Sequence, residues 1–183
     1  MDQYFTIRFL KGIGLSIAAS VFSGSAVFAG DTKKQIEFFL GTCFGSLDDV
    51  SRVQSLAALL KWKNAPADFA NLGKPVNSIK YETWLVQKEG EFYAVAVNQA
   101  PWNDRQIANV CSVAIQSSGN AVIAELTRVI KLKKVHEEDE PLQTTSYYEY
   151  ESMAVDRAMV SVVALKDGSA PVSLGVTGIR NNQ

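Results

Sequence analysis

The chain has 183 residues, with 18 Lys and Arg, 19 Asp and Glu and one His, and its formal net charge at pH 7 is −1. Such a balanced mixture of charges excludes the clustered basic surface with which proteins bind nucleic acid. Residues 1–29 hold Arg8, Lys11 and Asp2, so the remainder keeps 16 basic and 18 acidic residues and a net charge of −2. The remainder therefore has no polybasic segment for a membrane surface, and its length suits one domain of ordinary size.

The N-terminus has the layout of a secretory signal peptide. A short basic start precedes residues 13–28, which carry no charge and are rich in Ala, Val, Phe, Ser and Gly. Signal peptidase requires small side chains at the first and third positions before the cut. Ala29 and Val27 meet this requirement, and cleavage after Ala26, with Gly24 at the third position, is the alternative. We expect cleavage after Ala29.

A transmembrane anchor is the competing interpretation of the same stretch. A helix that crosses a bilayer needs about 20 strongly apolar residues, whereas this stretch is shorter and is interrupted by Ser and Gly. No cysteine follows it, as a lipoprotein anchor would require, and no later segment is long and apolar enough to span a membrane. We therefore expect residues 30–183 to be a single exported domain, periplasmic or extracellular, with no membrane span after signal cleavage.

Both cysteines, Cys43 and Cys111, lie behind the predicted cleavage site. An even number of cysteines in an exported chain favours one disulfide. Such a bond would close a loop of roughly 69 residues and stabilise the fold by about 4 kcal/mol. Two separate buried thiols are the alternative. Neither cysteine belongs to a Cys-x-x-Cys pair and the single histidine is distant in sequence, so we expect neither a zinc site nor a thioredoxin-like redox function.

The predicted mature chain opens with two helical patterns. The first begins at Asp31 or Thr32, either of which can cap a helix. Its apolar residues recur at helical spacing as far as Cys43, which should face the core. The second begins near Ser46, whose hydroxyl and following acidic residues suit a helix N-terminus. Turn-forming residues over 64–78 then predict a connecting loop.

Alternation of apolar and polar residues predicts six strands in the rest of the chain. They span residues 79–87, 91–99, 108–116, 145–153, 158–165 and 173–179. A third helix is expected over residues 120–133, followed by an exposed acidic loop over 136–141. Short turns between neighbouring strands imply antiparallel pairing. The sequence therefore predicts an α+β fold with two N-terminal helices, three antiparallel strands, a helix and three more antiparallel strands, with the helices on one face of the sheet.

The sequence offers no motif for catalysis or for a cofactor. His136 is the only histidine, and it lies in the acidic stretch, where we interpret it as an exposed loop residue. A Ser-His-Asp or Cys-His system would have to use it. No serine outside the predicted signal peptide has the Gly-x-Ser-x-Gly surroundings of a hydrolase nucleophile. The carboxylates at 137–140 lack the spacing of a calcium loop. We therefore expect no enzymatic activity, no cofactor and no metal.

Aromatic residues are numerous in the predicted strands and turns. Tyr148 and Tyr150 share one face of a strand, because alternate side chains of a strand point the same way. Trp102 follows Pro101 in a predicted turn, and recognition residues are common in such loops. Exposed aromatic side chains mark many binding surfaces, and packing in the core is their competing role. We select Trp102, Tyr148 and Tyr150 as candidate recognition residues.

These observations favour an exported, non-enzymatic binding or accessory protein whose partner is another envelope or extracellular protein. Two alternatives stay open. The chain could carry a small apolar ligand between its sheet and its helices, or it could be a hydrolase that uses carboxylates or a Ser–Lys pair. A flat aromatic surface would support the first interpretation, an enclosed apolar cavity the second and a polar cleft the third.

Overall fold

A computed structural model describes residues 31–72, 74–168 and 171–181 of the chain. The strands of this part form one antiparallel sheet in the order β1-β2-β3-β4-β8-β7-β6-β5. They are β1 (Lys63–Asn64), β2 (Lys80–Lys88), β3 (Glu91–Asn103), β4 (Gln106–Ile115), β5 (Lys133–Asp139), β6 (Gln143–Tyr150), β7 (Arg157–Leu165) and β8 (Val172–Asn181). The predicted α+β fold with antiparallel strands is confirmed. The predicted signal peptide and its cleavage site at Ala29 lie outside the described residues.

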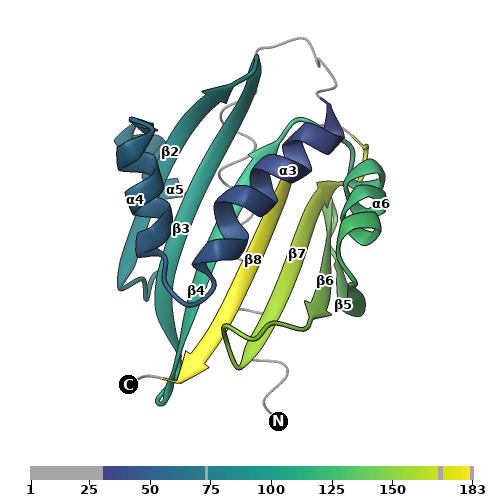
Figure 1. Cartoon of the computed structure of the whole chain (residues 1–183). Coiled ribbons are helices and arrows are strands. Elements are labelled where there is room, and N and C mark those ends of the chain that lie inside the picture. Colours follow the sequence, from purple (N-terminus) through teal and green to yellow (C-terminus); the bar gives the residue numbers. More distant parts are fainter. Residues whose placement is uncertain (1–30, 73, 169–170, 182–183) are drawn as a thin grey trace.

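The sheet consists of two meanders that meet in its middle. Strands β1 to β4 pair in chain order, and so do β5 to β8. The last strands of the two meanders, β4 and β8, pair with each other from Gln106 opposite Asn181 to Ile115 opposite Val172. Each meander follows a helix that packs on the same face of the sheet (Figure 1). The chain thus repeats a helix-plus-meander unit, with four strands in each unit instead of the three expected.

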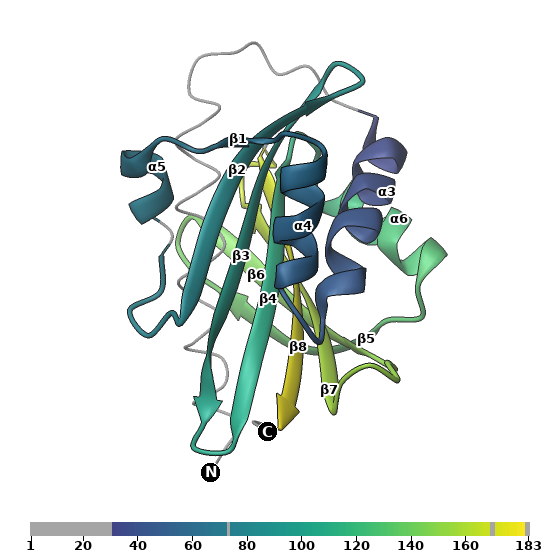
Figure 2. The same cartoon turned by 60° about the vertical axis from the view of Figure 1, so that its left-hand side comes forward.

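The helices that cover the sheet lie on one of its faces. They are α3 (Thr32–Cys43), the 3₁₀ turn η1 (Phe44–Ser46), α4 (Ser51–Leu59) and α6 (Gly119–Val129). Helix α3 runs across the middle of this face, between α4 near β2 and β3 and α6 near β7 (Figures 1 and 2). The Asp31 carboxylate caps α3, because it accepts hydrogen bonds from the backbone N–H groups of Lys33 at 3.1 Å and Lys34 at 3.4 Å. The short helix α5 (Ala67–Leu72) lies beside the edge formed by β1 and β2 (Figure 2).

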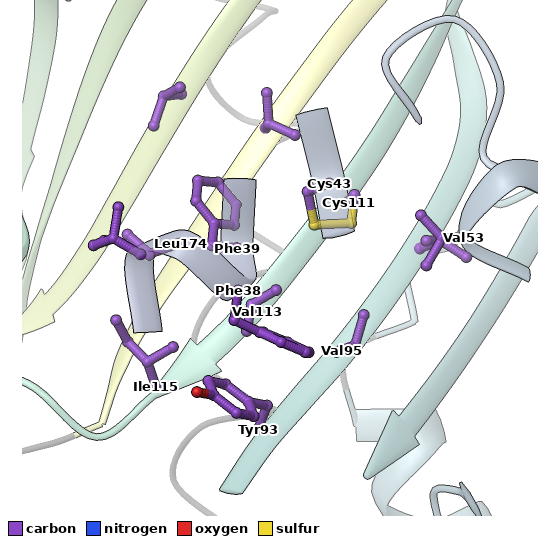
Figure 3. Packing of buried hydrophobic residues seen from close by; sticks show 14 of the residues in the cluster. Phe38, Phe39, Cys43, Val53, Tyr93, Val95, Cys111, Val113, Ile115 and Leu174 are labelled. Carbon is purple, nitrogen blue, oxygen red and sulfur yellow. A yellow bond between two sulfur atoms is a disulfide. The ribbon is translucent and has the colours of Figure 1, made fainter. Parts of the chain in front are cut away.

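The core fills the layer between the helices and the sheet. Phe39 of α3, Val113 of β4 and Leu174 of β8 are all completely buried in this layer (Figure 3). Cys43 and Cys111 form a disulfide with a Cα–Cα distance of 5.3 Å. The predicted disulfide is therefore confirmed, and it ties the end of α3 to the middle of β4. A buried disulfide is compatible with an oxidising, exported location.

The segment between α3 and α4 is fixed directly on the sheet. The Asn109 side-chain amide on β4 donates hydrogen bonds to the backbone carbonyls of Leu47 at 3.2 Å and Asp48 at 2.9 Å. Strand β8 passes so close to the same segment that a Cβ atom at Gly178 would overlap the Leu47 carbonyl. Only glycine permits this approach of two backbones. The start of α4 is therefore placed by β4 and β8.

The predicted helix over 120–133 is too long, and the acidic loop predicted over 136–141 is wrong. Helix α6 ends at Val129, and residues 133–139 form the edge strand β5, which includes His136. Most side chains of β5 are exposed, and its backbone pairs only with β6. An exposed edge strand has no apolar face to bury, so its sequence shows no period-two pattern.

Two further boundaries differ from the prediction. The loop expected over residues 64–78 contains helix α5, and β3 continues into the turn expected over 100–104 as far as Asn103. The extension of β3 is stabilised by its pairing with β4, which runs from Ala94 opposite Ala114 to Asn103 opposite Gln106. No helix of the described residues is long and apolar enough to cross a membrane.

Candidate functional site

A groove opens on the helix-bearing face between α3, α4 and the end of β2. It has a volume of about 510 Å³, and its lining is mostly apolar. The apolar part consists of Phe38, Gly41, Leu56, Leu60, Trp62 and Val86, and the polar part of Glu37, Thr42, Gln87 and Lys88. We call it the aromatic groove.

The end of α4 places Trp62 in the wall of the groove. Lys61 adopts a left-handed backbone conformation with φ of 54°. The backbone N–H of Trp62 donates to the Ala57 carbonyl at 2.9 Å, and that of Lys61 donates to the Ala58 carbonyl at 3.2 Å. These two bonds form a Schellman motif, which closes a helix and turns the chain back across its last turn. Trp62 therefore returns toward the sheet instead of pointing into solvent.

Phe38 and Trp62, which line the groove, belong to a cluster of aromatic rings that continues into the core beneath it. The Phe38 ring stacks on Tyr93, with centroids 3.9 Å apart, and lies 6.0 Å from the Trp62 ring. Trp62 in turn contacts Trp84 edge to face at 6.2 Å. Figure 3 shows Phe38 and Tyr93 side by side above β3. Because Phe38, Tyr93 and Trp84 are at most 8% exposed, the rings form a rigid surface whose geometry is set by the core.

The rim of the groove combines exposed leucines with charges of both signs. Leu59 and Leu60, at the end of α4, are 77% and 56% exposed. The Lys88 ammonium lies 5.9 Å from the centroid of the Phe38 ring, a favourable position for a cation. Glu37 also lines the groove. Apolar contact is therefore available both inside the groove and on the rim beside it.

Tyr93, which packs against Phe38 behind the groove lining, stays neutral. Burial, and then the carboxylates of Glu91, Glu89 and Asp31, raise the pKa of Tyr93 to about 12. Its hydroxyl therefore keeps its proton at any physiological pH. The Phe38 and Trp62 rings in the groove suit an apolar group.

The three recognition residues chosen from the sequence do not form one exposed surface. Tyr148 is only 5% exposed and belongs to the core. Tyr150 is half-buried, and its ring lies 5.2 Å from that of Phe44. Trp102 is half-buried on the opposite face of the sheet, where it packs against a cluster that includes Met159. The structure does not bring these residues together in one surface.

Tyr150 does line a second hollow, at the end of β6 and β7. This hollow has a volume of about 970 Å³ and lies between the α6–β5 connection and the β6–β7 turn. Its walls carry both signs of charge, and one pair of them, Arg157 and Glu149, is joined by hydrogen bonds. It lacks the aromatic lining of the groove, so the groove is the stronger candidate for recognition.

The described residues contain no cluster of three or more His, Cys, Asp and Glu that could hold a metal ion. His136 lies on the edge strand β5 and is about 41% exposed, with its Nε2 atom 3.8 Å from a Glu138 oxygen. Its ring lies 5.8 Å from that of Tyr147. These contacts place the histidine at the sheet edge, away from both hollows.

Sequence reasoning missed the residues that build the groove. Phe38 and Trp62 follow helical and loop patterns that look the same whether a ring is buried or lines a surface. The one usable signal was the position of Trp62 just after α4, but a lysine at the left-handed position hid the Schellman motif. Comparison of the chain with protein-family models, with curated proteins and with solved structures gave no significant match.

Proposed function

We propose that this protein is an exported, non-enzymatic accessory protein that binds a partner protein through the aromatic groove. The observation that carries the proposal is the rigid aromatic lining with exposed leucines beside it. Binding energy at protein interfaces concentrates where aromatic and apolar anchors enter well-packed pockets. A pocket whose side chains are already fixed supports such binding, because these side chains lose little conformational entropy when the partner docks.

The shape of the site favours a protein over a small molecule. Small-molecule sites enclose most of the surface of their ligand. Here Leu60 at the edge of the groove and Leu59 beside it extend the apolar surface, and a small ligand in the groove would leave Leu59 exposed. A partner that inserts one side chain and lays a surrounding surface over the rim would cover both. The space between sheet and helices, considered from sequence as a ligand cavity, holds packed side chains such as Phe39 and Leu174.

The chemistry of the groove indicates an uncharged apolar anchor on the partner. Phe38 and Trp62 provide flat apolar contact, and Gly41 leaves open space, because a Cβ there would meet no atom within 4 Å outside its chain neighbours and its own helix backbone. Lys88 and Glu37 at the rim can meet charges of either sign on the surrounding partner surface. Export itself rests on the predicted signal peptide, and the buried disulfide supports it.

Site-specific photo-crosslinking in the native host tests this function. A photoreactive amino acid replaces Leu59 in one variant and Leu142 in another, since these leucines are similarly exposed at 77% and 75%. We expect one protein to be captured from position 59 and not from position 142. With that partner purified, Leu60→Glu should weaken binding at least tenfold in calorimetry, whereas Leu142→Glu should not. Equal capture from both positions, or unchanged affinity of the Leu60 variant, would rule out the groove.

A further inference from the structure

The edge of β2 that borders the aromatic groove has no neighbouring strand in the part of the chain that the structure describes. The register of β1 with β2 covers Trp84 and Leu85. Residues 86–88 lie beyond this pairing, complete β2 and line the groove. The left-handed conformation of Lys61 turns the chain away from β2 at this point, toward the end of α4. An open strand edge therefore lies beside the groove.

The backbone N–H and C=O of Gln87 point out of this open edge. The Thr83 carbonyl accepts a hydrogen bond from the N–H of Ala65, which follows β1, at 2.9 Å. Alternate residues of an antiparallel strand direct their backbone groups to the same side, so Gln87 faces the same edge as Thr83. The position that would pair with Gln87 is that of Lys61, whose N–H donates to the Ala58 carbonyl instead. Among the described residues, no backbone group pairs with Gln87 on this side.

An extended segment of a partner can occupy this edge and the groove together. Gln87 and Lys88 are exposed, and an exposed, unpaired strand edge accepts a further strand. Side chains directly opposite each other in a sheet point to the same face. The added residues on either side of the one that pairs with Gln87 would therefore point, like Val86 and Lys88, toward the helix-bearing face and the groove. A helix of the partner cannot pair in this way, because its backbone groups are bonded to one another.

The cations beside the groove have no carboxylate partner, whereas the acids there do. Lys88 lines the groove, and Lys61 lies between two other lining residues at the end of α4. Among the described residues, no Asp or Glu forms an ion pair with either lysine. The carboxylates of Glu37, in the groove, and Glu89, next to Lys88 in sequence, lie 4.0 Å and 3.6 Å from lysines of α3. The unpaired charge is therefore positive, and it favours acidic residues on the partner.

We propose that the partner segment bound at the aromatic groove is an extended strand in which an apolar residue is flanked by acidic ones. The segment pairs by its backbone with Gln87, which offers one N–H donor and one C=O acceptor. Its apolar side chain enters the groove against Phe38 and Trp62, and its carboxylates meet Lys61 and Lys88. This inference rests on the proposed function, and it adds the conformation and the composition of the segment that binds.

The heptapeptide acetyl-Gly-Thr-Glu-Leu-Glu-Thr-Gly-amide is a suitable probe, and the sample is isotope-labelled protein purified from its native host. We expect amide NMR titration to give a dissociation constant of about 1 mM or lower. The Gln87 amide resonance should shift more than that of Val86, whose backbone groups face Tyr93 of β3. A peptide with serine in place of the leucine should bind at least tenfold more weakly, because it lacks the apolar anchor.

Methylation of single backbone nitrogens in the heptapeptide tests the extended conformation. Each methyl group removes one N–H donor, and in an extended segment only alternate N–H groups face β2. The leucine side chain lies in the groove, so its own N–H points away from β2 and its methylation should be tolerated. Methylation of at least one of the two glutamates should weaken binding about tenfold, because the Gln87 carbonyl loses its donor. Equal effects at the leucine and both glutamates, or no effect at any of them, would overturn the proposal.

Charge reversal on the protein tests the acidic composition of the segment. Lys88→Glu should weaken heptapeptide binding about tenfold, because repulsion replaces attraction. Lys131→Glu makes the same change at an exposed site between α6 and β5, and as the matched control it should bind normally. Unchanged affinity of Lys88→Glu, or no binding of the heptapeptide, would overturn the proposal.

The crosslinking experiment at Leu59 separates this inference from the proposed function. Capture of a partner there without heptapeptide binding would leave the proposed function standing and overturn the extended segment alone. Binding of the heptapeptide as expected, without capture of any protein, would overturn the proposed function and support the strand edge as a peptide site.

Discussion

Lys61 holds a backbone conformation that lysine disfavours, and the aromatic groove depends on it. Its φ of 54° is the left-handed conformation at the end of a Schellman motif, where glycine is the usual residue. A residue with a Cβ atom loses about 1–2 kcal/mol in this conformation. Trp62 follows directly, so the strain at Lys61 is tied to the position of a groove wall.

We expect Lys61→Gly to stabilise the protein. Glycine removes the left-handed strain from the folded state, but it also raises the conformational entropy of the unfolded chain. Because the first effect is the larger, the free energy of unfolding should rise by about 0.5–1 kcal/mol. Urea denaturation followed by circular dichroism measures the change. Lys61→Ala keeps the Cβ atom and should give no gain. A gain of the same size from both substitutions would show that the lysine side chain, rather than the backbone, is the source of the strain.

At the residue scale, the sequence predicted which way the cysteines face but not which aromatic side chains are exposed. Cys43 and Cys111 were placed correctly on core-facing positions, because each lies in a long periodic pattern that fixes its direction. Tyr148 and Tyr150 were correctly placed in a strand, whereas Trp102, expected in a turn, lies in β3. Their exposure, however, depends on which strands pack beside them, and no local pattern contains that information.

At the scale of whole elements, the predictable segments are those with one apolar and one polar side. Helix α3 and strands β2, β7 and β8 were predicted close to their observed bounds. Strand β5 was missed because it lies at the sheet edge and consists mostly of charged residues, which bury no face. Helix α5 was missed because its six residues lie between turn-forming segments, where helix propensity alone is a weak signal.

The disulfide is the covalent link between a helix and the sheet, and its removal should weaken that link. Cys43 and Cys111 are 68 positions apart, and opening a loop of this length should cost about 4 kcal/mol of unfolding free energy. We expect the Cys43→Ala/Cys111→Ala double variant to show this loss in urea denaturation. A loss below about 1 kcal/mol would mean that α3 is held on β4 by packing alone.

Accessibility of the bond provides a separate check. Cys43 and Cys111 are 0% and 1% exposed, so a reductant must wait for the protein to open before it can reach the sulfurs. Thiol trapping of the native protein in dithiothreitol should therefore be slow and should accelerate when urea is added. Fast reduction without urea would indicate that α3 opens locally, and it would leave the double-variant prediction unaffected.

At the scale of the whole molecule, the class of the fold was predictable and the strand order was not. Local turns specify that consecutive strands pair, and this accounts for both meanders. The junction of β4 with β8 joins segments about 65 residues apart, and such a pairing is selected by the complete core rather than by a turn. The continuous sheet that carries α3, α4 and the aromatic groove follows from that junction.

Buried tyrosines should make the whole fold sensitive to alkaline pH. Burial raises the pKa of Tyr81 and of Tyr93 from 10.0 to about 12, and it also raises the pKa of Tyr147 and Tyr150. Between about pH 10 and about pH 12 the unfolded chain releases tyrosine protons that the folded chain keeps. The unfolded state then binds fewer protons than the folded state, so the free energy of unfolding falls as the pH rises.

We therefore expect constant stability with respect to these groups below about pH 9 and a progressive loss above about pH 10. Urea midpoints measured across this range test the loss, and near-ultraviolet absorbance of tyrosinate reports the ionisation directly. The Tyr81→Phe/Tyr93→Phe double variant should lose stability less steeply, because two of the shifted groups are gone. If its alkaline slope matches that of the wild type, these two hydroxyls ionise normally in the folded protein, and the Tyr81 and Tyr93 rings are more hydrated than their burial indicates.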